Sequence, residues 1–251
     1  MSDPSPIVES IMLPLEQKRE PFWSWIDVAV FAVGAPIVVA GVAVLLLAVV
    51  KTLHGRMDTA LSLLGMQSLL YVAAYGLMWL ILAVRHSDNL WGALLWAVRP
   101  AAGGKLFAAG FALAFGTALL GVALHAPKID NPILKFMRDP ASILAVVVFA
   151  STIGPAAEEA VFRGFLQPVA TRTLGAAIGI ACTSLVFAAL HGFEYQWCWQ
   201  YLLLVFSASC AFGWTRWRWN STGASTLLHA GYNLTFFMGY LFQGRTFPSH
   251  G

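Results

Sequence analysis

Seven long apolar runs limit how this chain of 251 residues can fold. Each run is close to the length of about 20 residues with which a helix crosses a bilayer. The runs are continuously apolar and do not alternate as barrel strands do. We therefore predict an all-α fold, a polytopic bundle of about seven transmembrane helices. The expected spans are approximately residues 25–50, 59–84, 105–125, 142–167, 174–190, 197–214 and 222–242.

Composition supports a membrane protein and argues against a nucleic-acid partner. Hydrophobic residues make up 59% of the chain and charged residues 11%, against about 45–50% and about 25% in soluble domains. Lysines and arginines lie mainly in the connectors, where they set orientation, so we expect no nucleic-acid partner. The expected partners are the lipid bilayer and a membrane-associated peptide or protein substrate. Nothing in the sequence indicates an oligomeric state.

The chain divides into four segments on the basis of where its polar residues fall. Residues 1–24 are a polar N-terminal segment, and residues 25–140 carry generic apolar spans that we interpret as scaffold. Residues 141–243 bring polar residues into the spans and form one membrane domain with 25–140, and residues 244–251 are a tail. Because the first apolar run starts too late for a signal peptide, we expect the first helix to be retained. The predicted connectors on one side of the membrane hold eight lysines and arginines, and those on the other side hold six. This small difference slightly favours a cytoplasmic N-terminus.

Up to about residue 139 every charged residue falls near a predicted helix end or in a connector, whereas from residue 141 onward the spans themselves acquire polar side chains. A charged residue at the centre of a span costs at least about 2.5–3.5 kcal/mol, so it usually faces the protein interior and has a partner or a task. We therefore look for function in the second half of the chain. The residues concerned are Glu158, Glu159, Arg163, His191, His229 and Asn233.

The stretch "GPAAEEAVFRGFLQP", residues 154–168, holds three of these charges. Residues four apart share a helix face, so we expect Glu159 and Arg163 to pair. Glu158 lies about 100° further round the helix and stays available as a base towards a water molecule. Pro155 predicts a bend just before the glutamates, because it has no N–H to donate.

The depth of each polar residue in the membrane can be estimated from the helix rise of about 1.5 Å per residue, counted from the nearest connector. Measured from the connector near residue 173, Glu158 and His191 lie about 22 and 27 Å along two antiparallel helices. From the connector near residue 220, Asn233 lies about 20 Å in and His229 about 14 Å in. Glu158, His191 and Asn233 are therefore expected at a similar depth, with His229 a turn or two short of it.

These four side chains have the chemistry of a hydrolase. Glu158 and His191 can deprotonate and orient a water molecule, while His229 and Asn233 can donate hydrogen bonds to the oxyanion that forms. Alternatively, Glu158, His191 and His229 are the donor types of a catalytic zinc site. The HExxH zinc helix is absent. The cofactor stays unknown: zinc is one open route, and we slightly favour the metal-free route.

Three motifs in order resemble the CAAX prenyl protease and bacteriocin-processing family (CPBP, or Abi) of intramembrane proteases. "EEAVFR", residues 158–163, matches its EExxxR motif, "FAALH", residues 187–191, its FxxxH motif, and "HAGYN", residues 229–233, its HxxxN motif. The resemblance covers about residues 141–242. It implies a multi-helix endopeptidase acting on prenylated CAAX proteins in eukaryotes and on other peptides or membrane proteins in bacteria. It also implies Glu158 and His191 as water activators and His229 and Asn233 as the oxyanion hole. Members of the family have been interpreted both as metalloproteases and as metal-free glutamate proteases.

Structural interpretations compete with the catalytic one. Within this resemblance we expect Glu159, Arg163 and Phe187 to support the site, Phe187 by packing. His229 and Asn233 taken alone are typical of interhelical hydrogen bonding. The polar cluster also suits a non-catalytic interaction or bacteriocin-immunity protein, or a transporter with a proton relay. We assign no role to His86, expect Glu194 to be solvated, and expect the protein in the plasma membrane of a bacterium.

Overall fold

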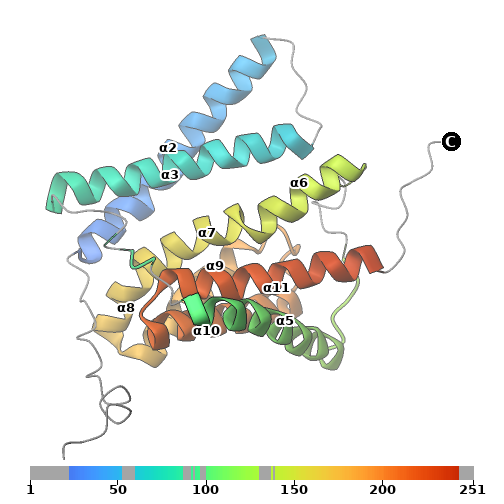
Figure 1. Cartoon of the computed structure of the whole chain (residues 1–251). Coiled ribbons are helices and arrows are strands. Elements are labelled where there is room, and N and C mark those ends of the chain that lie inside the picture. Colours follow the sequence, from blue (N-terminus) through green and yellow to red (C-terminus); the bar gives the residue numbers. More distant parts are fainter. Residues whose placement is uncertain are drawn as a thin grey trace, which may run out of the picture.

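The computed structural model describes residues 23–52, 60–86, 92, 94–96, 100–129, 137 and 139–242. Helices hold most of these residues and none of them lies in a β-strand, which confirms the predicted all-α bundle (Figure 1). In chain order the elements are α2 (Trp25–Thr52), α3 (Ala60–His86), α5 (Pro100–Ala123), α6 (Pro140–Ser151), α7 (Ile153–Glu159), the π-helical η2 (Ala160–Leu166), α8 (Gln167–Leu174), α9 (Ala176–Leu190), α10 (Trp199–Trp219) and α11 (Thr222–Phe242).

The helix boundaries differ from the predicted spans mainly in the middle of the chain. Elements α6 to α8 form one continuous helical rod of 35 residues, Pro140–Leu174, so the predicted end at residue 167 was wrong. The rod ends at Gly175, whose φ of 79° is accessible to glycine at little cost. By length and composition, four of the described helices can cross a membrane, namely α2, α3, the 22-residue stretch Ala102–Ala123 of α5 and the rod. The predicted count of seven spans is therefore approximate.

The rod bends before the two glutamates. Element α6 ends at Ser151 and α7 begins at Ile153. Pro155 explains why the break lies at Thr152. Proline has no N–H to donate to the carbonyl of Ser151, four residues earlier, and its ring crowds that carbonyl. The bend therefore agrees with the one predicted from the proline.

The rod then winds as a π-helix through η2. At the end of this segment the N–H of Gln167 bonds to the carbonyl of Phe162, five residues earlier instead of four. Such single-turn π segments occur frequently at functional sites. This one lies directly after Glu159 and contains Arg163.

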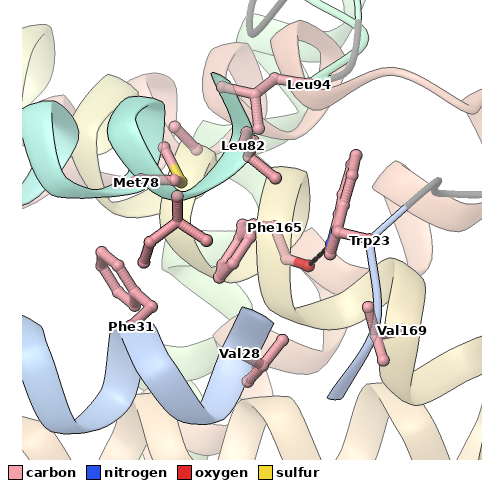
Figure 2. Packing of buried hydrophobic residues seen from close by; sticks show 10 residues of the cluster. Trp23, Val28, Phe31, Met78, Leu82, Leu94, Phe165 and Val169 are labelled. Carbon is pink, nitrogen blue, oxygen red and sulfur yellow. Dashed lines mark hydrogen bonds between the residues drawn. The ribbon is translucent and has the colours of Figure 1, made fainter. Parts of the chain in front are cut away.

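The first two helices are fixed to the rod by an apolar cluster around η2. Trp23 stacks on Phe165 with ring centroids 5.8 Å apart, and its indole N–H donates to the Phe165 carbonyl at 2.9 Å (Figure 2). Phe31 of α2 meets the same ring edge-on. The further members of this cluster are Val28, Met78, Ile81, Leu82, Leu94, Ala160 and Val169.

Helix α11 is held by a close crossing with α5. A Cβ placed on Gly110 would lie 2.3 Å from the Leu228 carbonyl oxygen, and one on Gly231 would lie 2.1 Å from the Phe107 carbonyl oxygen. The two backbones therefore meet through glycines, as small residues allow in membrane helix packing. The crossing sets the position of the helix that carries His229 and Asn233.

The start of α11 is anchored by its cap and by a short segment before α5. The hydroxyl of Ser221 accepts from the Ala224 N–H at 3.1 Å, as an N-cap does. The N–H of Thr222 donates to the Leu95 carbonyl at 2.8 Å, and its hydroxyl donates to the Leu94 carbonyl. Most of the predicted connector between the second and third spans lies outside the described residues. Residues 244–251 and most of 1–24 do so too, so the division into segments stays a prediction.

Candidate active site

Glu159 and Arg163 form the predicted ion pair, and both side chains are buried. Nη1 of Arg163 lies 3.0 Å from Oε1 of Glu159, and the two side chains are 1% and 0% exposed. Arg163 comes four residues after Glu159, so the two side chains lie on one face of the helix where α7 continues into η2. Burial makes the pair costly to break, because either partner alone would be a buried charge.

Arg163 is also fixed by its surroundings on other helices. Its Nη2 donates to the carbonyl and the hydroxyl of Ser209 on α10, at 2.9 and 2.5 Å. The guanidinium lies over the rings of Phe187, Phe212 and Phe162, at 4.7, 5.6 and 5.8 Å from their centroids. Cation–π contacts of this kind are strongest in desolvated sites. Arg163 therefore joins the rod to α9 and α10, and its supporting role in the site stays a prediction.

His229 lies between the two adjacent glutamates. Its Nδ1 is 3.0 Å from Oε1 of Glu159, and its Nε2 is 3.8 Å from Oε2 of Glu158. Because a carboxylate only accepts, Nδ1 carries a proton and donates it to Glu159. Phe212 stacks on the imidazole at 4.3 Å and fixes the plane of the ring. The structure thus brings the first and last of the three motifs together.

The two glutamates differ in exposure. The side chain of Glu159 is fully buried, whereas that of Glu158 remains 26% exposed. Among its neighbours, Glu158 has the His229 ring and the hydroxyl of Tyr71. Glu158 is therefore the more accessible of the two carboxylates.

His191 and Phe187 lie at the end of α9, next to this cluster. Nδ1 of His191 lies 2.8 Å from the Phe187 carbonyl oxygen. A carbonyl cannot donate, so Nδ1 holds the proton and Nε2 keeps its lone pair in the neutral ring. The Phe187 ring lies 4.5 Å from the His191 ring and 6.0 Å from that of His229. Phe187 thus packs against the rings of both histidines.

Asn233 is placed one turn beyond His229 on α11, and its side chain reaches the bend of the rod. Its Nδ2 donates to the carbonyl of Ala150 at 2.8 Å. An amide nitrogen has two N–H groups, so this bond uses one and leaves the other for a second acceptor. The predicted oxyanion donor is therefore also a structural link between α11 and α6.

The loop after His191 lies next to the cluster, with the Tyr195 ring 6.4 Å from that of His191. Glu194 lies close enough for its charge to act on Glu158, and the hydroxyl of Tyr195 interacts with Glu194. Burial, followed by the nearby charge of Glu194, raises the pKa of Tyr195 well above its usual value. Glu194 is half-buried here, so the expectation of a simply solvated side chain was wrong.

His86 has a partner, contrary to the sequence interpretation. Its Nε2 lies 3.1 Å from Oδ2 of Asp27, and Nε of Arg85 lies 2.5 Å from Oδ1 of the same residue. Asp27 is fully buried and also accepts from the Ser24 N–H at 2.8 Å. This cluster ties the start of α2 to the end of α3. It was missed because its members are far apart in the sequence.

The donors do not form the predicted zinc ligand set as they are arranged. Within the described ranges, no three histidine, cysteine, aspartate or glutamate side chains are placed to share a metal ion. His229 turns both ring nitrogens towards carboxylates, and Nδ1 of His191 is used by a carbonyl.

Comparison with protein families matches residues 140–235 to the family described as type II CAAX prenyl endopeptidase Rce1-like. The chain is thus similar to this Rce1-like family over residues 140–235. The Rce1-like segment runs from the start of α6 into α11 and contains all three motifs. This match confirms the resemblance seen in the sequence and supports a membrane-embedded, CAAX protease-like peptidase. No curated protein and no solved structure matched the chain.

Several residues of the site were not singled out from the sequence. Ser209 and Phe212 on α10 contact Arg163, and Tyr71 and Tyr75 on α3 approach the glutamates from the scaffold half. The spacing of four residues between the two tyrosines is a signal in the sequence, because it places both on one face of the helix. Ser209 has none, because a single serine in an apolar helix is common.

Proposed function

We propose that the protein is an intramembrane endopeptidase that hydrolyses peptide bonds of membrane-associated peptides or proteins, with Glu158 as the general base. The family supports the class of activity, and the residue roles are our assignment. The observation that carries the assignment is the unequal partnering of the adjacent glutamates. Glu159 is committed to Arg163 and His229, while Glu158 is partly exposed and faces His229 at 3.8 Å.

In the proposed reaction Glu158 removes one proton from a water molecule as the water oxygen attacks the substrate carbonyl carbon. Nε2 of His191 accepts a hydrogen bond from the second O–H and so orients the water. The C=O electron pair moves to the carbonyl oxygen and forms a tetrahedral oxyanion. When this collapses, the C–N bond breaks and the proton held by Glu158 passes to the leaving amine. Water is divided between the two products, and Glu158 returns to its starting state.

The oxyanion receives hydrogen bonds from His229 and Asn233 in this proposal. The second N–H of the Asn233 amide is the neutral donor. Nε2 of His229 donates when the ring carries both protons, with the Nδ1 proton held by Glu159. Each donor of this kind lowers the barrier by about 2.7–4 kcal/mol in a comparable site. The aromatic packing of Phe212 and Phe187 on His229 keeps the donor in place.

The activity is tested with purified protein in proteoliposomes and two peptides of one sequence, a farnesylated peptide ending in a CAAX motif and its unprenylated counterpart. Mass spectrometry identifies the products. We expect one internal bond to be cut, and we expect His191→Ala to abolish cleavage while the protein stays folded. Unchanged cleavage by His191→Ala would overturn the assignment.

The main alternative is a non-catalytic membrane interaction or immunity protein that uses the same polar cluster to bind a peptide. It predicts that the nearly isosteric Glu158→Gln variant preserves the cellular phenotype, which the peptidase proposal does not. A proton-coupled transporter predicts uptake driven by a pH gradient in the same proteoliposomes. A location in the plasma membrane of a bacterium stays a prediction.

A further inference from the structure

Two tyrosines on α3 face the part of the rod that carries the glutamates. Tyr71 and Tyr75 are four residues apart and share one helix face. The hydroxyl of Tyr75 donates to the carbonyls of Ala157 and Ala156, at 2.6 and 3.2 Å. These carbonyls directly precede Glu158 in the chain. Helix α3 is therefore bonded to the backbone from which the proposed base projects.

Tyr71 lies one turn before Tyr75, and its ring is held by the rod. It stacks on Phe149 of α6 with ring centroids 6.1 Å apart and planes 6° from parallel. Its hydroxyl interacts with the side chain of Glu158, with Gln67 as a second polar neighbour. Tyr71 therefore contacts the rod at Phe149, before the bend, and interacts with Glu158, after it.

We propose that Tyr71 is a positioning residue of the active site: its hydroxyl donates a hydrogen bond to the carboxylate of Glu158 and holds that side chain towards His229. The proposal rests on the proposed function. Glu158 is 26% exposed and lies 3.8 Å from Nε2 of His229, which is too far for a hydrogen bond to fix the side chain. A glutamate side chain has three rotatable bonds, and a misplacement of about 1 Å in an active site can cost about a hundredfold in rate.

This assignment extends the site into the scaffold half. Tyr71 and Tyr75 lie outside the Rce1-like segment, residues 140–235. The contact also gives α3 a second task, because any displacement of this helix from the rod would release Glu158 from its donor.

The test uses the Tyr71→Phe variant, which keeps the ring and its stacking on Phe149 and removes only the hydroxyl. The matched control is Tyr75→Phe, the same chemical change on the same face, where the hydroxyl bonds to backbone carbonyls instead of a carboxylate. Infrared difference spectra of the wild type against Glu158→Gln isolate the carboxyl band of Glu158. We expect Tyr71→Phe to shift this band and Tyr75→Phe to leave it at the wild-type frequency.

Kinetics provide the second measurement. We expect Tyr71→Phe to lower kcat by about tenfold to a hundredfold with KM nearly unchanged, because the substrate contacts remain while the base is misplaced. A Glu158 band that does not move in Tyr71→Phe overturns the proposal, whatever the activity. If the band moves but the wild type cleaves no peptide, the Tyr71–Glu158 bond stands and the proposed function fails.

Discussion

The carboxylate oxygen Oε1 of Glu159 lies 3.0 Å from Nδ1 of His229, a residue 70 positions later in the chain. The same oxygen lies 3.0 Å from Nη1 of Arg163. Glu159 thus joins the rod to α11 and fixes the protonated nitrogen of the histidine. Its neighbour Glu158 faces the other nitrogen, and this arrangement separates a supporting carboxylate from an accessible one.

Removing the charge of Glu159 is expected to destabilise the protein strongly. In Glu159→Gln the buried Arg163 loses its counter-ion, a change that costs about 3–5 kcal/mol when one partner of a buried pair is removed. Thermal unfolding in detergent should show a clear drop in Tm. The control is Glu158→Gln, which removes the partly exposed carboxylate and should lower Tm much less. Equal losses of stability in the two variants would contradict the division of roles.

Arg163→Lys keeps a positive charge but should not replace the arginine. A lysine ammonium cannot reproduce the planar fork that reaches Glu159 and both acceptors of Ser209 together. We expect reduced cleavage and a loss of about 1–3 kcal/mol in unfolding free energy, as for other unsatisfied buried polar groups. The measurement is kcat/KM beside the unfolding midpoint in detergent. Wild-type values for both would show that charge alone is needed at this position.

The glycine crossing between α5 and α11 predicts a position-specific effect of one methyl group. Gly110→Ala would place a Cβ 2.3 Å from the backbone of α11, and the backbone cannot yield as a side chain can. We expect a loss of about 1–3 kcal/mol in stability, as for other overpacked sites, and weaker cleavage because His229 moves with α11. Gly116→Ala on the same helix meets nothing within 4 Å and serves as the control, with both Tm and activity near wild type.

Treatment with a strong chelator is expected to leave cleavage unchanged. The side-chain roles proposed for Glu158, His191, His229 and Asn233 use no metal ion, and the described donors are not gathered into a three-ligand site. The measurement is the initial rate before and after chelation, with elemental analysis of the purified protein. Stoichiometric zinc together with chelator-sensitive cleavage would favour the zinc route instead.

Much of this architecture was predictable from local patterns. The apolar runs locate the helices, although the rod ends at residue 174 instead of the predicted 167. The spacing of four in the first motif predicts the Glu159–Arg163 pair, found at 3.0 Å. Pro155 predicts the bend that lies at Thr152. These features depend on helix geometry and on chain neighbours, which the sequence displays directly.

The contacts between distant helices were not predictable in the same way. The depth estimate placed His229 one or two turns short of the glutamates, whereas it contacts both. Straight helices were assumed, but the rod bends at Thr152 and winds as a π-helix through η2, and both changes alter depth. The contact of Tyr71 with Glu158 depends on how α3 packs against the rod. No single sequence motif contains that information.

The most direct test of the account is the cleavage rate of Glu158→Gln, measured with a peptide that the wild type cuts and with Tm recorded on the same sample. Loss of a general base costs about 10²–10⁴ in rate. The account predicts a fall in kcat within that range at a Tm close to that of the wild type. A Glu158→Gln protein that cleaves at the wild-type rate would contradict it.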